Sequence, residues 1–259
     1  HFKQVASIVK ADPSRRFVIA SAPGKRFKED TKVTDLFYTC YNMTRKHEDI
    51  SEIYQQISDR YFDIIRELGL SFDISGELTY IKNAMLLHSG RDFAASRGEY
   101  LNSIILAKYL GFDFIDAENV VFFKDDGSFD AELTNTTLAK ELAKHPNAVI
   151  PGFYGTMPNG TIKTFSRGGS DITGAIVARA AEADVYENWT DVSGMMMADP
   201  RVVENPNIIE TVTYRELREL SYMGATVLHE DAVFPAQIAG IPINIRNTNA
   251  PADSGTTIV

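Results

Sequence analysis

Two glycines, an arginine, two serines and an aspartate fall within one short stretch, residues 164–171. Glycine takes positive φ and lets the backbone come close to a ligand. A helix beginning near Ser170 would point free N–H groups and the positive end of its dipole at a bound anion, and Arg167 offers a planar fork of donors for carboxylate or phosphate. The alternative is an ordinary capped helix, with Ser170 or Asp171 as N-cap and the glycines as loop. By itself the stretch favours neither interpretation.

The sequence on either side of residues 164–171 predicts a strand before this stretch and a helix after it. Pro158-Asn159-Gly160 predicts a hairpin turn just before it, and apolar residues at helical spacing predict a helix over residues 171–183 just after it. Further strands are predicted at 17–20, 112–116, 148–153, 184–189, 243–246 and 254–259, and further helices at 2–10, from 34 onward with Thr34-Asp35 as its cap, 49–68, 78–87, 92–110, 133–144, 213–223 and 227–239. This alternation predicts an α/β fold, a three-layer α/β/α sandwich with a mostly parallel central sheet. We expect one domain over residues 1–259, because no linker or internal repeat is visible.

The composition is that of a globular protein with a sizeable core, since 44% of the 259 residues are hydrophobic. The formal net charge of −9 argues against nucleic acid as the main partner, because no broad basic surface is expected. Cys40 is the single cysteine, so an intrachain disulfide is excluded and a reducing, cytoplasmic setting is the simplest inference. No apolar run reaches transmembrane length, and no histidines have metal-ligand spacing. We expect neither a membrane partner nor a protein-bound metal.

Small and polar residues follow four of the predicted strands, at Ser21, at Gly152, over 167–171 and at Thr190-Asp191. The carboxyl ends of parallel strands lie along one edge of a sheet, so we expect these loops to gather there. The chain has neither a Gly-x-x-x-x-Gly-Lys-Ser/Thr loop nor a Gly-x-Gly-x-x-Gly motif. Phosphate-binding features without either motif favour a small-molecule kinase of another fold, since phosphoryl transfer needs mainly positioning and charge neutralisation.

Two further segments carry charge. Glu99 lies in Ser96-Arg97-Gly98-Glu99, near the predicted start of a helix, where a carboxylate gains from the helix dipole; contact with a ligand is the less favoured alternative. The loop over residues 25–32 is rich in lysine and arginine and is predicted to be mobile. It could steer ATP, but a solvated loop is the commoner explanation of such a run.

Five segments, in order along nearly the whole chain, resemble the aspartokinase family. Residues 164–171 are similar to its Gly-Arg-Gly-Gly-Ser-Asp signature. The other four are Ser21-Ala22 with Thr34-Asp35, Ser96–Glu99, Trp189–Gly194 followed by Ala198–Arg201, and Gly224–His229. The resemblance implies the amino-acid kinase fold and the phosphorylation of the β-carboxylate of L-aspartate to 4-phospho-L-aspartate by MgATP. That reaction is the first step towards lysine, threonine and methionine, and the family resemblance also implies a homodimer.

The resemblance implies a role for each matching residue. Arg167 would pair with the α-carboxylate of aspartate, Glu99 with its α-ammonium group, and Asp171 would orient the substrate, with Asp171 and Arg167 as catalytic residues. The other substrate contacts would be Ser21, Thr34 and Ser170, and the ATP contacts Gly168, Gly169, Thr190, Asp191, Met196, Arg201 and Thr226. Mg²⁺ would be bound through the ATP phosphates. A zwitterionic substrate needs one cation and one anion fixed apart, which Arg167 and Glu99 would supply.

Three departures from the family pattern stand out. The family begins with a strand and Lys-Phe-Gly-Gly, whose lysine neutralises the transferring phosphoryl group. That segment would precede His1, so we expect residues 1–259 alone to be a poor catalyst. Thr226 stands where many relatives have a nucleotide-contacting lysine. The family usually carries two C-terminal ACT-type regulatory modules, and the sequence stops at Val259, so we expect a fragment without feedback inhibition.

Three alternatives to aspartate kinase remain open. Another amino-acid kinase would act on glutamate, N-acetylglutamate or a nucleotide, although the pairing of Arg167 with Glu99 favours a free α-amino acid. A non-catalytic module that binds a nucleotide or an amino acid would fit the missing lysine. A purely structural partner domain would leave the ordered motifs unexplained.

Overall fold

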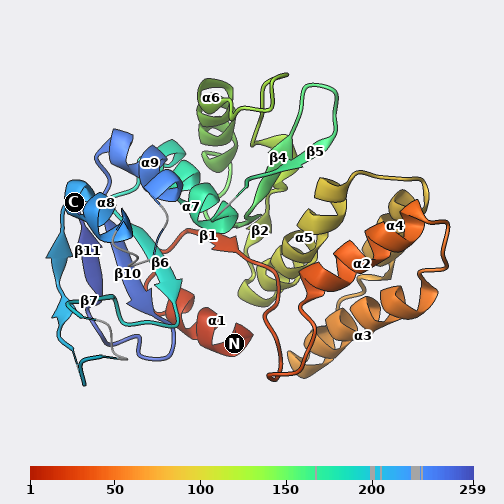
Figure 1. The fold of residues 1–259 in the computed structure, drawn as a ribbon, viewed down its shortest axis with the longest axis horizontal. Coiled ribbons are helices and arrows are strands. Elements are labelled where there is room, and N and C mark those ends of the chain that lie inside the picture. The colour runs from red at the N-terminus through yellow and green to blue at the C-terminus, as the bar shows by residue number, and fades with distance from the viewer. Residues whose placement is uncertain (167, 199–201, 205, 223–227, 229) are drawn as a thin grey trace. The chain divides into compact units, whose positions relative to one another are not determined.

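The computed structural model describes residues 1–166, 168–198, 202–204, 206–222, 228 and 230–259. The chain divides into two compact units, each with its own sheet and helices (Figure 1). Unit 1 comprises residues 1–15 and 166–259, and unit 2 comprises residues 16–165. The predicted site residues fall in both units.

Unit 2 is built on a three-stranded parallel sheet with the order β1-β3-β2. Its elements are β1 (Phe17–Ala20), α2 (Val33–Arg45), α3 (Ser51–Glu67), α4 (Ser75–Leu86), α5 (Arg91–Leu110), β2 (Asp113–Phe114), the 3₁₀ turn η1 (Ala117–Asn119), α6 (Ala131–Leu142), β3 (Ala148–Pro151), β4 (Tyr154–Thr156) and β5 (Ile162–Thr164). All four residues of the middle strand, β3, are apolar and buried, as expected for a parallel strand covered on both faces. Gly152 N donates to Ala20 O over 3.1 Å, so the carboxyl ends of β1 and β3 do meet.

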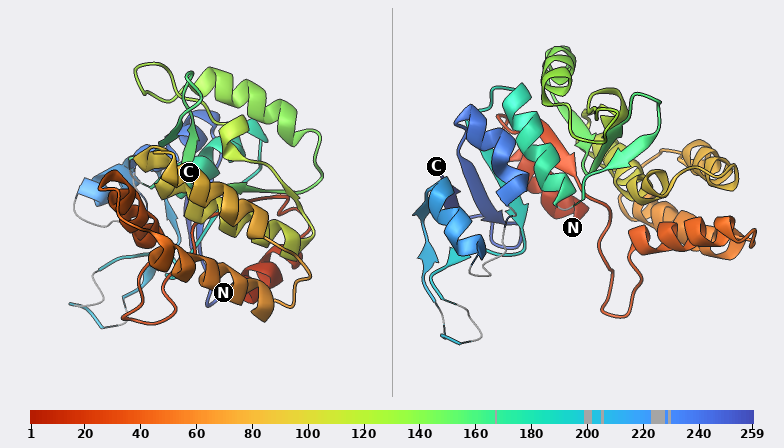
Figure 2. Two further views of the ribbon diagram at one scale, coloured as in Figure 1. Left: turned by 90° about the vertical axis from the view of Figure 1, so that its right-hand side faces the viewer. Right: turned by 45° about the horizontal axis from the view of Figure 1, so that its top comes forward.

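Helix α5 is the central helix of unit 2. It contacts β1, β2 and β3, and α2, α3 and α4 pack against it in turn (orange to yellow in Figure 2). Residues 94–99 and 101–107 of α5 are buried on every side, which explains why its sequence has no one-sided apolar stripe. Gly111, with φ at 75°, ends the helix in the left-handed conformation. The polar residues among 94–99 and 101–107 of α5 therefore lie in the interior of the unit.

The predicted hairpin is present as β4 and β5, which pair antiparallel. Three rings, those of Phe123, Phe129 and Phe165, pack together with centroid separations of 5.0 to 6.3 Å. Thr164 N donates to a carboxylate oxygen of Asp92 over 3.0 Å, which joins the end of β5 to the first turn of α5. This contact fixes the end of the hairpin, at Thr164, on α5 within unit 2.

Unit 1 has a four-stranded mixed sheet with the order β6-β10-β11-β9. Its elements are α1 (Phe2–Lys10), α7 (Gly169–Ala180), β6 (Tyr186–Thr190), β7 (Met195–Met196), β8 (Ile208–Ile209), β9 (Thr211–Val212), α8 (Tyr214–Tyr222), α9 (Glu230–Ala239), β10 (Ile243–Asn247) and β11 (Thr256–Ile258). β6 runs parallel to β10 and β9 parallel to β11, while β10 and β11 are antiparallel. Helices α7 and α9 pack on each other, and α7 lies on β6. Apolar side chains of α7, α9, β10 and β11 fill the core of the unit.

A charged cluster joins Arg15, in the segment that follows α1, to this sheet. The Glu187 carboxylate on β6 accepts hydrogen bonds from Arg15 at 2.6 and 3.1 Å, from Arg246 at 3.2 Å and from the Trp189 indole at 3.0 Å. Both guanidinium groups also stack over the Trp189 ring. Burial raises the pKa of Glu187, but the hydrogen bonds from Arg15 and Trp189 outweigh it and leave the pKa below its usual value. Glu187 is therefore held as an anion between two arginines.

Most of the predicted elements are confirmed within a few residues, and three details of the helix starts were wrong. Helix α2 begins at Val33 with Lys32 as N-cap, so Thr34 and Asp35 lie in its first turn and do not cap it. Helix α7 begins at Gly169 with Gly168 as N-cap, in place of Ser170 or Asp171. Helix α5 begins at Arg91, so Glu99 is two turns inside the helix and gains nothing from its positive end.

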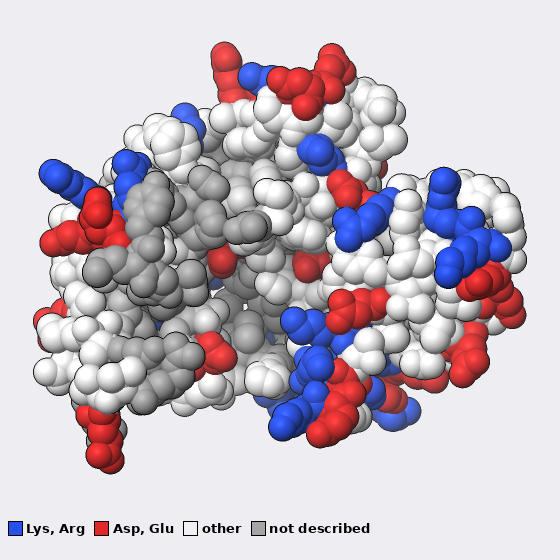
Figure 3. Space-filling view, in the orientation of Figure 1, with Lys and Arg blue, Asp and Glu red and all other residues white. Residues whose placement is uncertain are grey.

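No helix among the described residues is long and apolar enough to cross a membrane. On the face of the molecule in Figure 3, basic and acidic side chains alternate over the helices of unit 2. The loop between β1 and α2, which was predicted to be mobile, is held by ion pairs that are described below.

Candidate active site

Glu99 is a buried acid on α5 of unit 2. Its side chain is only 8% exposed, and its Oε2 atom is buried with no hydrogen-bond partner in the described structure. Burial raises its pKa to about 7, although backbone N–H groups of Glu99 and Ala22 and the charge of Arg97 act in the opposite direction. A buried carboxylate oxygen without a partner is costly unless a ligand completes it. The arrangement suits a cationic group such as an ammonium.

Gly98 brings two other predicted substrate residues close to Glu99. A Cβ atom at position 98 would lie 2.9 Å from Ala22 Cβ and 3.7 Å from Thr34 Oγ1. The absent side chain therefore lets the loop after β1 and the first turn of α2 pack directly on α5. Asn102, one turn further along α5, donates from Nδ2 to Ser21 O over 2.6 Å. The segments that carry Ser21, Thr34 and Glu99 thus meet within unit 2.

Replacing Gly98 by alanine is expected to destabilise the protein by about 1 to 3 kcal/mol, as overpacking does, and to weaken binding of the aspartate that the sequence resemblance implies. The physical reason is that the new methyl group would meet Ala22 Cβ, which cannot rotate away. Denaturant unfolding and calorimetry with aspartate measure the two effects. Gly76→Ala on α4 is the matched control, because no atom lies within 4 Å of the added Cβ. Equal behaviour of the two variants would contradict the close-approach role of Gly98.

In unit 1, the start of α7 holds the glycine-rich stretch. Gly168 has φ 55° and ψ 31°, a left-handed conformation that glycine adopts without strain, and Gly169 is buried at the first helical position. The first hydrogen bond inside the helix runs from Ile172 N to Gly168 O over 2.8 Å. The preceding N–H groups, those of residues 169–171, thus belong to the free end of the helix, which attracts anions.

Asp171 lies one residue after Ser170 in the first turn of α7 and is tied to β6. Asn188 Nδ2 donates to Asp171 Oδ1 over 2.9 Å and to the Tyr186 hydroxyl over 2.9 Å. Burial raises the pKa of Asp171, and the hydrogen bond from Asn188 partly offsets it. Gly174 makes room for this contact, since a Cβ there would lie 2.4 Å from the Tyr186 hydroxyl oxygen. The amide therefore orients one oxygen of the carboxylate.

The predicted nucleotide contacts of unit 1 follow β6. Thr190 ends this strand, and its hydroxyl lies 3.3 Å from a carboxylate oxygen of the exposed Asp191. Thr248 holds the strand end, because its N–H and hydroxyl both donate to Thr190 O at 2.8 and 2.9 Å. Met196 lies in the short strand β7 and is 38% exposed, so its side chain is open to a ligand.

Three predicted site residues, Arg167, Arg201 and Thr226, lie outside the described residues. Among the described residues, no group of three or more His, Cys, Asp or Glu side chains is arranged to hold a metal ion. The described site residues thus form two sets, Ser21, Thr34 and Glu99 in unit 2 and residues 168–171, Thr190, Asp191 and Met196 in unit 1.

The sequence did not single out the side chains that orient these residues. Asn102 and Tyr61 contact the Ser21 and Gly98 carbonyl groups, at 2.6 and 3.0 Å, and Asn188 contacts Asp171. Asn102 is on the same helix as Glu99, and Asn188 stands two residues before Thr190. That closeness in sequence was the signal available for these two residues, whereas Tyr61 offered none.

Comparison with known proteins identifies the family to which the chain belongs. The sequence model described as the amino acid kinase family matches residues 2–247. Aspartokinase 3 of Bacillus subtilis is 39% identical over 274 residues, which cover 99% of this chain and 60% of that protein. The chain spans about 60% of the length of this relative.

Two solved structures agree with this. The aspartate kinase of Clostridium acetobutylicum is 50% identical with a TM-score of 0.94, over 99% of this chain and 58% of that one. Escherichia coli aspartokinase III, in complex with aspartate and ADP, is 25% identical with a TM-score of 0.81, over 99% of this chain and 60% of that one. The likeness confirms the predicted α/β fold. Since the family match extends over nearly every residue, the chain belongs to the amino acid kinase family.

Proposed function

We propose that the protein containing this chain transfers the γ-phosphoryl group of ATP to the β-carboxylate of L-aspartate. The observation that carries the proposal is the buried Glu99 carboxylate, whose Oε2 lacks a partner in the described structure, on the helix against which the segments of Ser21 and Thr34 pack. An α-ammonium group would donate a hydrogen bond to Oε2 and neutralise the charge of the carboxylate. The similarity of the chain to aspartokinases supports aspartate as the substrate.

The remaining roles form part of the same proposal. Arg167 binds the α-carboxylate, Ser170 and Asp171 orient the β-carboxylate, and Ser21 and Thr34 contact the substrate. The N–H groups at the start of α7, beginning at Gly168 and Gly169, receive the phosphates of ATP. The other contacts proposed for ATP are Thr190, Asp191, Met196, Arg201 and Thr226. Mg²⁺ is held through the ATP phosphates, where it neutralises charge during transfer.

We also propose that residues 1–259 act as one catalytic domain, with both units serving one reaction, in a cytoplasmic homodimer. The single cysteine supports a reducing compartment, and the resemblance to aspartokinases supports the dimer. Light scattering of the intact protein checks the dimer.

The test of the activity is the formation of aspartyl hydroxamate. The intact protein is incubated with MgATP, hydroxylamine and aspartate, and with glutamate or N-acetylglutamate in parallel. We expect hydroxamate from aspartate alone. Product from another amino acid instead would reassign the substrate. Binding of ATP and aspartate in calorimetry without any product would favour a non-catalytic binding module.

A further inference from the structure

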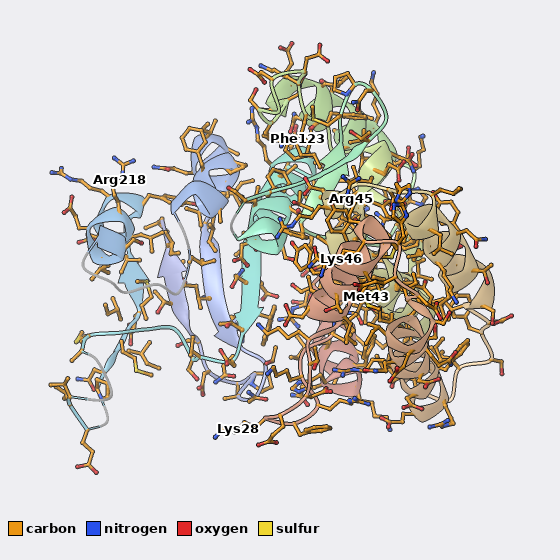
Figure 4. All side chains as sticks on the ribbon, turned by 45° about the vertical axis from the view of Figure 1, so that its right-hand side comes forward. Lys28, Met43, Arg45, Lys46, Phe123 and Arg218 are labelled. Atoms are coloured by element: carbon orange, nitrogen blue, oxygen red, sulfur yellow. The ribbon has the colours of Figure 1, made fainter. Side chains whose placement is uncertain are left out.

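The segment between Ser21 and Thr34 joins two proposed substrate contacts and is organised around one buried acid, Asp30. Its carboxylate accepts hydrogen bonds from Arg26 N, Nε and Nη2 at 2.9, 3.1 and 2.9 Å. Asp30 N also donates to Phe27 O over 3.1 Å, which closes the loop on itself. Although the outer side chains of this loop are exposed, Asp30 is only 7% exposed. Lys28, at the outer end of the loop, points away from the helices of unit 2 (Figure 4).

Arg60 of α3 reaches into this loop from the interior of unit 2. The Arg60 side chain is 4% exposed; its Nη1 donates to Asp30 Oδ2 and its Nη2 to the Gly24 carbonyl oxygen. One guanidinium group therefore holds two points of the segment, six residues apart in sequence. The hydrogen bonds from Arg26, together with Arg60, keep the pKa of Asp30 well below its usual value, so the pair stays charged at neutral pH.

The next residue of the same helix holds the other part of the substrate site. Tyr61 is fully buried, and its hydroxyl donates to Gly98 O on α5 over 3.0 Å, one residue before Glu99. Consecutive residues of α3 thus contact the loop that begins at Ser21 and the helix that carries Glu99. Gly98 itself lies against Ala22 of that loop, so the three segments meet at one place.

We propose that Arg60 and Tyr61 of α3, with Asp30, are positioning residues that fix the Ser21–Thr34 segment against Glu99 for substrate binding. A buried ion pair adds little net stability compared with apolar side chains of the same size, but it accepts only one arrangement of its partners. The loop could have been closed by Arg26 and Asp30 alone, which lie on the loop itself. Arg60 adds the connection to α3, and through Tyr61 to α5. The inference rests on the proposed aspartate site in unit 2.

The test measures steady-state kinetics of the intact protein with Arg60→Met, Arg60→Lys and Tyr61→Phe. Arg66→Met is the matched control, because Arg66 lies on the same helix and pairs with Asp63 in the solvent, away from the loop. With Arg60→Met we expect the KM for aspartate to rise on the order of tenfold or more, while the KM for ATP changes less than about twofold. Arg60→Lys keeps the charge but lacks the second donor for Gly24 O, so it should recover part of the loss. Tyr61→Phe should raise the KM for aspartate roughly two- to tenfold.

A folded Arg60→Met protein with the wild-type KM for aspartate would overturn the proposal, as would an equal effect of Arg66→Met. Hydrogen exchange of the amides of residues 22–32 gives a readout independent of activity. We expect faster exchange with Arg60→Met and unchanged exchange with Arg66→Met. If the wild-type protein makes no aspartyl hydroxamate, the proposed function fails, and the exchange result still decides the role of Arg60. If Arg60→Met does not fold, Arg60→Lys carries both measurements.

Discussion

Glu99→Gln is expected to weaken aspartate binding on the order of 100-fold and to stabilise the ligand-free protein at pH 8. Binding weakens because the variant loses the anion that pairs with the substrate ammonium. Stability rises because the wild-type protein holds a buried carboxylate with an unpaired oxygen, which an amide replaces without charge. A residue that lowers the stability of the fold but is required for ligand binding is expected at a binding site.

The pH dependence of stability follows from the raised pKa of Glu99. The carboxyl of Glu99 titrates near 4.5 in the unfolded chain and at about 7 in the folded protein. Between these values the folded state binds a proton that the unfolded state has lost, so wild-type stability falls as pH rises through the window. Above pH 7 the full difference applies, about 3 kcal/mol at 1.36 kcal/mol for each pH unit. Glutamine does not titrate, so the variant escapes this loss.

Urea unfolding of both proteins at pH 5 and pH 8, with calorimetry of aspartate binding, measures these effects. The stability gain from Glu99→Gln should be larger at pH 8 than at pH 5. Glu67→Gln at the exposed end of α3 is the control and should show no such dependence. A gain that is the same at both pH values would show that Glu99 is not a buried titrating group. Unchanged affinity for aspartate would remove Glu99 from the substrate site.

The sequence predicted the elements that depend on local pattern. The apolar run Phe17–Ala20 and the helix spanning Arg91–Leu110 follow from hydrophobicity and from a terminating glycine, and both are present. The motif residues Ser21, Thr34 and Glu99 converge because their segments pack at Gly98. The strands β7, β8 and β9 were missed, since each has two residues and no periodicity can be seen in so short a segment.

The partners of the site residues could not be predicted, because they depend on contacts far apart in sequence. Arg60 meets an acid 30 residues away, and Asn188 meets Asp171 across 17 residues. Nothing in the local pattern of α3 distinguishes Arg60 from the exposed Arg66. Dependence on distant contacts also explains the wrong N-cap of α7. Gly168 is the N-cap because of its left-handed backbone conformation, whereas the Asp171 side chain accepts a hydrogen bond from Asn188.

The second large effect is expected from Asp171→Asn, which should lower kcat by roughly 10² to 10⁴ without unfolding the protein. The amide has the same shape, and its oxygen can still accept the hydrogen bond that Asn188 Nδ2 makes with Oδ1 over 2.9 Å. What the variant loses is the negative charge on the oxygen that Asn188 leaves free. Because burial raises the pKa of Asp171, removing its charge should leave the stability of the protein unchanged or slightly higher at neutral pH.

The measurement is kcat and the KM for aspartate in the hydroxamate assay, with thermal unfolding of the same samples. Asp184→Asn, an exposed aspartate just after α7, controls for the loss of one charge from unit 1 and should leave kcat unchanged. A fall in kcat with little change in KM would place Asp171 at the reacting group, since such an effect removes an interaction made in the transition state. A rise in KM with kcat preserved would instead limit Asp171 to holding the bound substrate. Wild-type kcat and KM together would exclude it from the site.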